Sequence, residues 1–106
     1  MSYSLIYITA ADAEEAKALG RALVEARLAA CANVLPGIVP IFWWEGEVQE
    51  GSEAALIAKT RTDLVEQVIE LVKERHSYDC PCVVALPIEK GNPAFLDWIA
   101  EETGGA

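Results

Sequence analysis

Four apolar stretches of the chain have the length and composition of β-strands. Residues 3–9, YSLIYIT, are rich in β-branched and aromatic side chains and are too short for an ordinary helix. Residues 30–44 are mostly extended in character, and residues 53–60, EAALIAKT, are predicted to return alongside them. Residues 82–88, CVVALPI, are short and almost wholly apolar, which is typical of a strand at the centre of a sheet.

Apolar residues at helical spacing predict a first helix that runs to about residue 28. Its apolar positions are Ala16, Leu19, Leu23 and Ala26. Asp12 precedes them and can accept hydrogen bonds from the amides of the first turn, while Glu15 favours the positive end of the helix dipole. The helix should therefore begin just after Asp12.

Two further helices are predicted in the second half of the chain. Thr60 has the spacing of a helix cap, and the apolar residues that follow it at helical intervals end near His76. Asn92 is a good cap and Pro93 suits the first position of a helix, so a short third helix should close the chain. We expect residues 101–106 to be the fraying end of this helix.

Residues 30–60 are predicted to form one long hairpin with an irregular first strand. Pro36 and Pro40 each remove an amide donor, so this strand must be bent, bulged or at a sheet edge. Gly46 permits a tight reversal between the strands. Residues 41–44, IFWW, carry more apolar area than two helices can cover, which predicts that the protein associates with copies of itself.

The predicted elements follow the order strand, helix, strand, strand, helix, strand, and then an extra helix. This order is typical of an α+β protein, namely a ferredoxin-like βαββαβ sandwich with an antiparallel sheet and helices on one face. The chain has 106 residues, which is the size of one domain, so residues 1–106 are interpreted as a single domain.

The charge balance limits the partners. Seventeen acidic and eight basic residues give a formal net charge of -9, which repels nucleic acid and anionic membranes and attracts cations. The sequence contains no apolar run of the roughly 20 residues that a membrane helix needs, and residues 1–4 lack the basic start of a secretory signal. These features predict a cytoplasmic protein that binds neither nucleic acid nor membrane.

The heptapeptide at residues 76–82, HSYDCPC, holds the only histidine and two of the three cysteines. In an extended chain Cys80 and Cys82 point to the same side, so both sulfurs can meet one soft ion, with His76 adding a nitrogen. A closed zinc site needs four ligands, so a monovalent copper site or a site completed across subunits fits better. The alternative is a helix cap at His76 and two small apolar side chains at a strand start.

The remaining chemistry is sparse. Cys31 is interpreted as a core thiol, because cysteine is among the most buried residue types, although it can also act as a conditional ligand. A nucleophile formed by Cys80 or Cys82 with His76 would need a third group to orient the base, and the sequence indicates none. The chain has no phosphate-binding loop and no acid and base pair at a recognisable spacing. We therefore expect a protein that is not an enzyme.

Several short motifs, spread in order over nearly the whole chain, resemble those of the CutA divalent-cation-tolerance family. The motifs are RLAACAN at 27–33, PGI at 36–38, WEG at 44–46, KT at 59–60, HSYD at 76–79 with Pro81, LPI at 86–88, GN at 91–92 and FLDWI at 95–99. The resemblance implies a ferredoxin-like subunit in a tightly packed homotrimer that is joined by pairing of edge strands.

The resemblance also implies a role with metal ions. The family is linked to tolerance of copper and other divalent cations, and no catalytic reaction is established for it. Some copper-binding members carry a cysteine where this chain has Ile8 and a second histidine where it has Arg75. Relatives usually have a glutamate where this chain has Cys82, so a soft sulfur replaces a hard oxygen donor.

These observations lead to one main hypothesis and two competitors. The main hypothesis is a trimeric divalent-cation-tolerance protein that binds copper, or another divalent cation, at His76, Cys80 and Cys82 in metal homeostasis. The first competitor is a signalling or scaffold trimer that binds a small metabolite or a protein in clefts between subunits. The second is a stable structural module whose partner lies outside its own chemistry.

Overall fold

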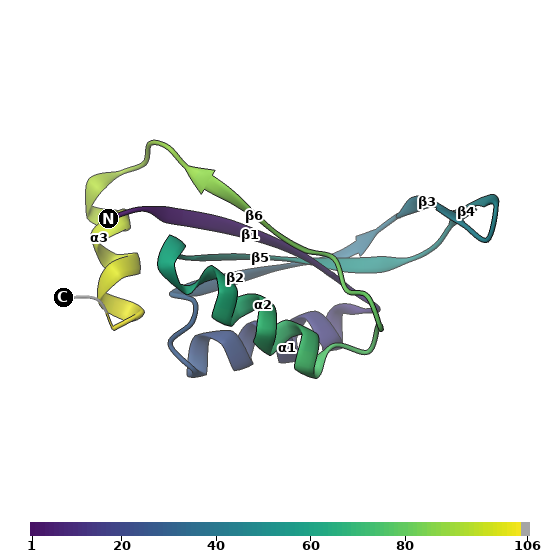
Figure 1. Cartoon of the computed structure of the whole chain (residues 1–106), viewed down its shortest axis with the longest axis horizontal. Coiled ribbons are helices and arrows are strands. Elements are labelled where there is room, and N and C mark those ends of the chain that lie inside the picture. Colours follow the sequence, from purple (N-terminus) through teal and green to yellow (C-terminus); the bar gives the residue numbers. More distant parts are fainter. Residues whose placement is uncertain (105–106) are drawn as a thin grey trace.

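The computed structural model describes residues 1–104 and is built on a four-stranded antiparallel sheet with the strand order β2-β5-β1-β6. Figure 1 shows this sheet along the length of the molecule. Its strands are β1 (Tyr3–Ala10), β2 (Cys31–Ile38), β5 (Glu53–Arg61) and β6 (Val83–Ile88). The predicted α+β class, with an antiparallel sheet and three helices, is confirmed.

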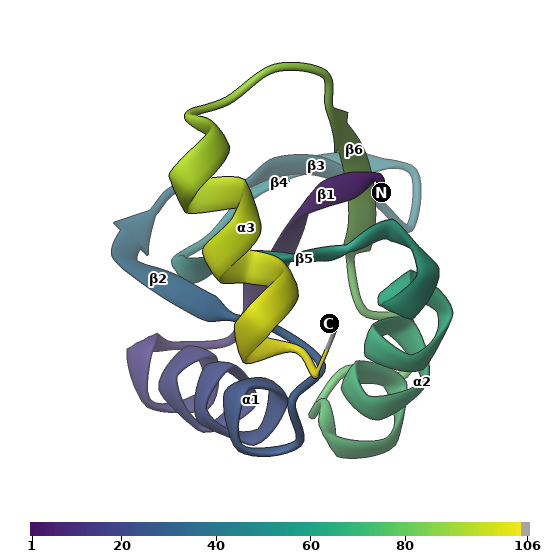
Figure 2. The same cartoon turned by 90° about the vertical axis from the view of Figure 1, so that its left-hand side faces the viewer.

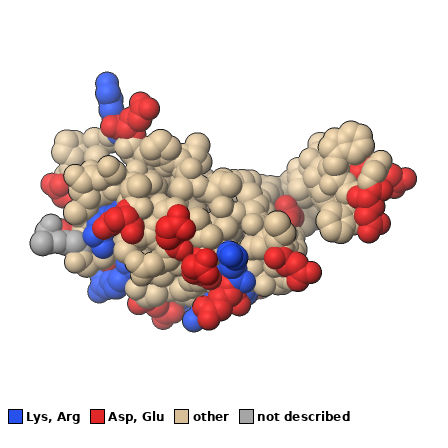
Figure 3. Space-filling model, viewed as in Figure 1, with Lys and Arg blue, Asp and Glu red and all other residues tan. Residues whose placement is uncertain are grey.

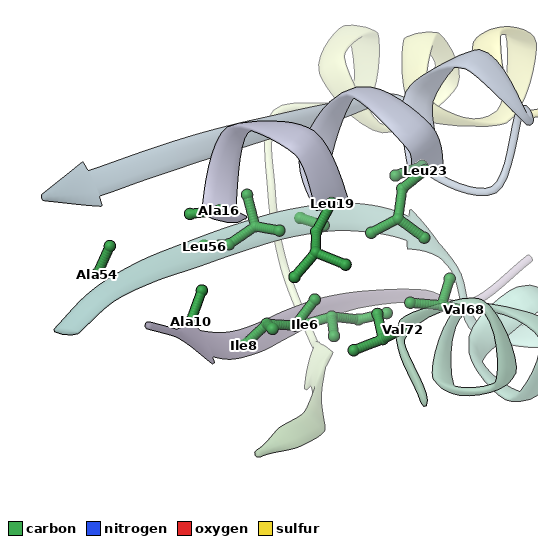
Figure 4. Close-up of a cluster of buried hydrophobic side chains, with 12 residues drawn as sticks. Ile6, Ile8, Ala10, Ala16, Leu19, Leu23, Ala54, Leu56, Val68 and Val72 are labelled. Carbon is green, nitrogen blue, oxygen red and sulfur yellow. The ribbon is translucent and has the colours of Figure 1, made fainter. Parts of the chain in front are cut away.

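The hydrophobic core lies between one face of the sheet and two helices, α1 (Ala13–Glu25) and α2 (Val65–Arg75). Figure 2 shows both helices on the same side of the sheet. Alternate residues of β1 are buried, because successive side chains of a strand point to opposite faces. Figure 4 shows Ile6 and Ile8 from β1, Leu56 from β5 and Leu19 from α1 pointing toward one another.

Helix α1 begins as predicted but ends earlier. The amide of Glu15 donates to Asp12 Oδ1 at 2.9 Å, so Asp12 is the cap. The helix stops at Glu25, about three residues before the predicted end, because Arg27 has a φ of 60°. This left-handed conformation closes the helix, and the amide of Leu28 donates back to the carbonyl of Leu23 at 2.9 Å.

The start of α2 differs from the prediction. A single 3₁₀ turn, η1 (Thr62–Leu64), precedes the helix. Thr60 does not cap it, because this residue is fully buried within β5, and its hydroxyl has no hydrogen-bond partner among residues 1–104. Thr60 has the spacing of a helix cap, but β5 continues to Arg61, so Thr60 lies within the strand and is buried.

Helix α3 (Pro93–Glu102) lies across one end of the sheet, where it packs on β5, and its start is as predicted (Figure 2). Asn92 Oδ1 accepts a hydrogen bond from the amide of Ala94 at 3.1 Å. Its other end is held rather than frayed. Arg27 Nη1 donates to the carbonyl of Glu102 at 3.1 Å, and Arg61 Nη2 donates to the carbonyl of Thr103 at 3.1 Å.

The expected fraying is therefore wrong for residues 101–104, because two arginines bind the last carbonyls of α3, where cations are favoured. Arg61 also donates from Nε to the hydroxyl of Thr103 at 3.0 Å, and the side chain of Thr103 is buried. The rest of that prediction, at residues 105–106, lies outside the described residues.

The long hairpin is present, and its outer half forms a sheet of its own. Strands β3 (Ile41–Trp44) and β4 (Glu47–Glu50) project from the body of the molecule, as Figure 1 shows. Glu45 and Gly46 both have positive φ, of 50° and 80°, which is the conformation of a tight hairpin turn. Trp43 and Trp44 are 75% and 61% exposed, so the helices leave this apolar ribbon uncovered, as predicted.

Strand β6 does not have the predicted central position. It lies at one edge of the four-stranded sheet, beside β1. Val84 and Leu86 point to the sheet face that α1 and α2 do not cover, and each is 51% exposed. The apolar character of β6 therefore reflects an uncovered surface of the single chain rather than a central place in its sheet.

Candidate functional site

The candidate site is the corner at residues 76–82, which joins the end of α2 to the start of β6 (Figure 1). His76 is the last residue of the helical turn, and its amide donates to the carbonyl of Val72 at 2.9 Å. Its backbone then takes an extended conformation, with φ −75° and ψ 145°, which turns the chain toward the sheet. The side chains of this corner contact three other elements, namely α1, β1 and β5.

His76 lies inside the corner, and both of its ring nitrogens are hydrogen-bonded. Nε2 lies 2.7 Å from the carbonyl oxygen of Thr9, which can only accept, so Nε2 donates. Nδ1 lies 3.0 Å from the amide nitrogen of Tyr78 and accepts from it. The side chain is fully buried. The ring is therefore a neutral tautomer with the proton on Nε2, and neither nitrogen is free to bind an ion.

Glu15 joins the start of α1 to the same corner. One carboxylate oxygen accepts from the amide of Ala11 at 2.9 Å and from the hydroxyl of Ser77 at 3.0 Å. The other accepts from the amide of Ser77 at 2.8 Å. Burial alone would raise the pKa of Glu15, but these donors favour the charged form and outweigh it, so the pKa is lowered.

Tyr78 joins the corner to the base of the hairpin. Its hydroxyl donates to Glu53 Oε2 at 2.6 Å, and Glu53 is the first residue of β5. This bond to a carboxylate, together with burial and the negative charge, raises the pKa of Tyr78 to about 12. The ring of Tyr78 also packs on His76, with centroids 4.8 Å apart. Residues 76–78, the inner part of the corner, thus form a closed network of hydrogen bonds.

The two cysteines lie on the outer part of the corner. Cys80 and Cys82 are free thiols and are exposed, and Pro81 between them is half-buried. The carbonyl of Cys82 accepts from the amide of Thr9 at 3.3 Å, which extends the pairing of β6 with β1 by one residue. The backbone is in line with β6 at Cys82, but residues 77–80 form a bend, so the extended course predicted for both cysteines does not include Cys80.

Both thiols line one pocket of about 770 Å³ between the corner and the hairpin. Carboxylates and aromatic rings form its walls. The other lining residues are Thr9, Pro40, Phe42, Trp44, Gln49, Glu53, Tyr78 and Asp79. The pocket thus combines soft sulfur donors, acidic groups and apolar rings.

The structure brings together two of the three predicted metal ligands. Cys80 and Cys82 line the pocket, whereas His76 lies behind it with its nitrogens occupied. Within residues 1–104, no three side chains of His, Cys, Asp or Glu are grouped closely enough to hold a metal ion. Metal binding at His76, Cys80 and Cys82 stays a prediction, and Cys80 and Cys82 are the part of that set that lines the pocket.

Cys31 is separate from this pocket. It starts β2, is half-buried and lies opposite Lys59 in the strand register. The ammonium group of Lys59 is hydrogen-bonded to Asn33 on β2. The interpretation of Cys31 as a core thiol is therefore only partly correct, because its side chain faces the sheet surface opposite α1 and α2.

The residues that build the site around the corner were not among the predicted site residues. Glu15 was interpreted only as a helix-start residue, and its bonds to Ser77 cross 62 positions of sequence. The pocket walls from Phe42 and Trp44 were assigned to subunit contacts. One signal was available, because a glutamate three residues after a capping aspartate is known to bind amides before the helix.

Comparison with known proteins agrees with the motifs. The family model described as "CutA1 divalent ion tolerance protein" matches residues 4–102. A divalent-cation tolerance protein CutA from Archaeoglobus fulgidus is 48% identical over 99 residues, which are 93% of this chain and 96% of that protein. A protein of the same name from Thermus thermophilus is 46% identical over 100 residues, which cover 94% of this chain and 97% of its own length.

Solved structures share the fold. The crystal structure of CutA1 from Oryza sativa superposes with a TM-score of 0.96 at 40% identity, covering 100% of this chain and 97% of that one. The structure of a protein called the periplasmic divalent cation tolerance protein CutA from Archaeoglobus fulgidus has a TM-score of 0.92 at 46% identity, covering 95% of this chain and 98% of that one.

The prediction of a cytoplasmic location is contradicted by these relatives. The similar proteins of rice and Arabidopsis thaliana are named chloroplastic, and the Archaeoglobus structure is named periplasmic. Relatives of this chain therefore occur in several compartments, so a cytoplasmic location does not follow. None of the helices within residues 1–104 is both long enough and apolar enough to span a membrane.

The names of the relatives refer to tolerance of divalent cations and not to a catalysed reaction. The match covers every strand and helix of the structure, from Ser4 in β1 to Glu102 at the end of α3. Sequence and fold thus identify the same group of proteins. The chain belongs to the CutA1 divalent ion tolerance protein family.

Proposed function

We propose that this protein takes part in tolerance of divalent cations by binding a metal ion, without catalysing a reaction, and that it works as a homotrimer. The single observation that carries the proposal is the pair of exposed thiols, Cys80 and Cys82, that line one pocket. Thiolates are good ligands for copper and other soft ions, so copper is the first ion to test and other divalent cations follow.

The charge of the molecule supports binding of a cation. Glu53 and Asp79 line the same pocket, and the formal net charge of the chain is -9. Figure 3 shows further acidic side chains at the outer end of the hairpin, where the sequence has Glu45 in the turn and Glu47 at the start of β4. A negative protein raises the local concentration of cations, which favours their capture.

The surface of the single chain supports assembly of three copies. Ile41, Trp43 and Trp44 on the hairpin are mostly exposed, and strands β2 and β6 lie at the two edges of the sheet. Apolar patches and edge strands are surfaces that proteins normally cover. In the proposed trimer each subunit is one ferredoxin-like domain, residues 1–106, and its hairpin and edges pair with its neighbours.

A metal titration tests the binding. The reduced protein is titrated with copper, zinc and cadmium, and heats and charge-transfer absorbance are recorded. We expect micromolar or tighter binding of at least one ion, weakened at least about tenfold in Cys80→Ser/Cys82→Ser. Cys31→Ser is the matched control and should bind as the parent does. Absence of binding at micromolar metal, or equal binding by the double variant, contradicts the proposal.

Light scattering tests the assembly. One chain has a mass of 11.5 kDa, and at micromolar concentration the mass measured by light scattering should be three times this value. Trp43→Lys places a charge on the apolar ribbon and should shift the population toward single subunits, whereas Glu45→Lys at the hairpin turn should not. A stable single subunit in the parent protein would remove the trimer from the proposal.

The pocket walls favour one second candidate, in which a small metabolite or a peptide binds between subunits. Pro40, Phe42 and Trp44 make one side of the pocket apolar, as in many small-molecule sites. A ligand screen by thermal shift, in the presence of a chelator, distinguishes the two functions. Shifts that persist without metal support this candidate, and shifts that need added metal support the first.

A further inference from the structure

We infer that Cys80 and Cys82 of one subunit form a two-coordinate site for a soft metal ion of the class of Cu(I), Ag(I) and Hg(II), without His76. The inference rests on the proposed function, because it names the class of ion and the complete ligand set for the same pocket. It also separates this chain from a site that would use the histidine, or ligands from a second subunit.

Cys80 and Cys82 line the same pocket from positions two residues apart. Cys82 directly precedes β6, and the bond from the Thr9 amide to the Cys82 carbonyl holds it in line with that strand. Exposure alternates along the tripeptide, since Cys80 and Cys82 are exposed and Pro81 is half-buried. The Cα atoms of residues two apart are separated by at most about 7 Å, so both sulfurs are within reach of one ion, and Pro81 adds a fixed φ between them. Both thiols line the same pocket.

Two neighbouring donors, His76 and Glu53, are already hydrogen-bonded. Both nitrogens of His76 are hydrogen-bonded, to Thr9 and Tyr78, and the ring is fully buried. To bind an ion, the ring would have to leave a buried carbonyl and an amide without partners, which is unfavourable. Glu53 accepts the short bond from the Tyr78 hydroxyl. No third His, Cys, Asp or Glu within residues 1–104 is grouped with the two thiols.

A site with only two thiolate ligands favours one class of metal ion. Structural zinc takes four protein ligands, and calcium or magnesium takes six or more oxygens, so two thiolates leave those ions incomplete. Soft ions with a filled d shell, such as Cu(I) and Ag(I), accept two thiolates in a linear arrangement and favour sulfur over oxygen. Phe42 and Trp44 line the pocket and add apolar surface, which disfavours strongly hydrated ions.

The binding step balances without electron transfer. Two S–H bonds break, two sulfur–metal bonds form, and two protons leave to the solvent for each ion bound. The site then carries one negative charge with a monovalent ion and none with a divalent one. Proton release is therefore a direct measure of how many thiols bind each ion.

The experiment uses the full chain in a Cys31→Ser background, so that only the two corner thiols remain. The reduced protein is titrated with Ag(I) without oxygen, in weak buffer, and a separate sample is titrated with Zn(II). We expect one Ag(I) per subunit, two protons released per ion, and affinity for Ag(I) at least 100-fold above that for Zn(II). Cys80→Ser and Cys82→Ser, taken singly, should each lose most of the Ag(I) affinity.

The single histidine of the chain supplies an independent measurement that needs no variant at His76. Its ring proton resonances should not move when Ag(I) binds. A shift of these resonances, a ratio of one ion to two or three subunits, or tighter binding of Zn(II) would overturn the two-coordinate site and leave metal binding itself standing. Absence of binding by every ion would remove the proposed function as well.

Discussion

The corner at residues 76–82 has two halves with opposite character. In the inner half, residues 76–78, four hydrogen bonds of 2.6–3.0 Å join the corner to α1, β1 and β5, and a fifth, of 3.0 Å, lies between His76 and Tyr78. In the outer half, residues 80–82, two exposed thiols face a pocket. The inner half is built for rigidity, and the outer half is left free to bind.

The contrast between the bonded inner half and the exposed outer half indicates how a small site is positioned. Thiols on a mobile loop would lose entropy on binding an ion, whereas thiols next to a bonded corner are already positioned. His76 and Tyr78 are in this view positioning residues, since they fix the backbone that carries Cys80. Variants in the inner half should therefore change stability, and variants in the outer half should change metal binding.

The largest expected effect on stability comes from His76→Ala. The change leaves the Thr9 carbonyl and the Tyr78 amide without partners and opens a cavity beside Tyr78, so the free energy of unfolding should fall by about 3 kcal/mol. Denaturant unfolding at a fixed protein concentration measures it. A loss no larger than that of a surface substitution would contradict the closed inner half.

A smaller effect is expected from Glu15→Gln, which weakens the bonds to Ala11 and Ser77 by about 1–2 kcal/mol at neutral pH. The pKa of Glu15 is lowered in the folded protein, so its contribution is present above the unfolded pKa and is lost as pH falls through the folded value.

The measurement is unfolding of parent and Glu15→Gln at several pH values. Their difference should be constant near neutral pH and should shrink below about pH 4. Glu14→Gln is the matched control, because Glu14 is exposed and pairs only with Lys17 at 3.6 Å in the helix. If the control shows the same pH dependence, the corner is not its source.

Tyr78→Phe should cost about 1 kcal/mol, because it removes the hydroxyl bond to Glu53. The pKa of Tyr78 is raised to about 12, so this contribution is fully present below pH 10 and is lost as pH rises toward 12. Titration of tyrosinate absorbance should show one of three tyrosines ionising last. That late component should vanish in Tyr78→Phe and persist in Tyr7→Phe.

The smallest effect on stability is expected in the outer half. Cys80→Ser and Cys82→Ser should each change the free energy of unfolding by less than about 0.5 kcal/mol, since both side chains are exposed. The same variants should have the largest effect on metal binding. A cost near that of His76→Ala would mean that the thiols are packed, and the contrast between the two halves would disappear.

Local features were predictable because their causes are local. Asp12 and Asn92 cap helices through bonds to amides two or three residues away, and Glu45 and Gly46 turn the hairpin within four residues. Thr60 shows the limit of such reasoning, since it has cap spacing but lies in β5. A residue near a strand end can satisfy either pattern, and only the length of the strand decides.

The position of β6 required the whole fold. Its apolar sequence suits a central strand, yet it lies at the edge beside β1. Strand order depends on how the helical connections cross the sheet, and a strand's own residues do not record its neighbours. An apolar edge strand is explained only when surfaces of other copies are considered, which is why it supports the trimer proposal.

The sequence by itself determined the class of fold, the helix caps, the hairpin with its exposed aromatic residues, and the family, because each depends on residue types at short spacing. Tertiary structure alone decided the roles within the corner. It buried the ring of His76 against Thr9 and left Cys80 and Cys82 at a pocket with Phe42 and Trp44. These contacts join residues tens of positions apart. Burial and hydrogen bonding therefore decide that His76 has a positioning role, whereas Cys80 and Cys82 remain free thiols.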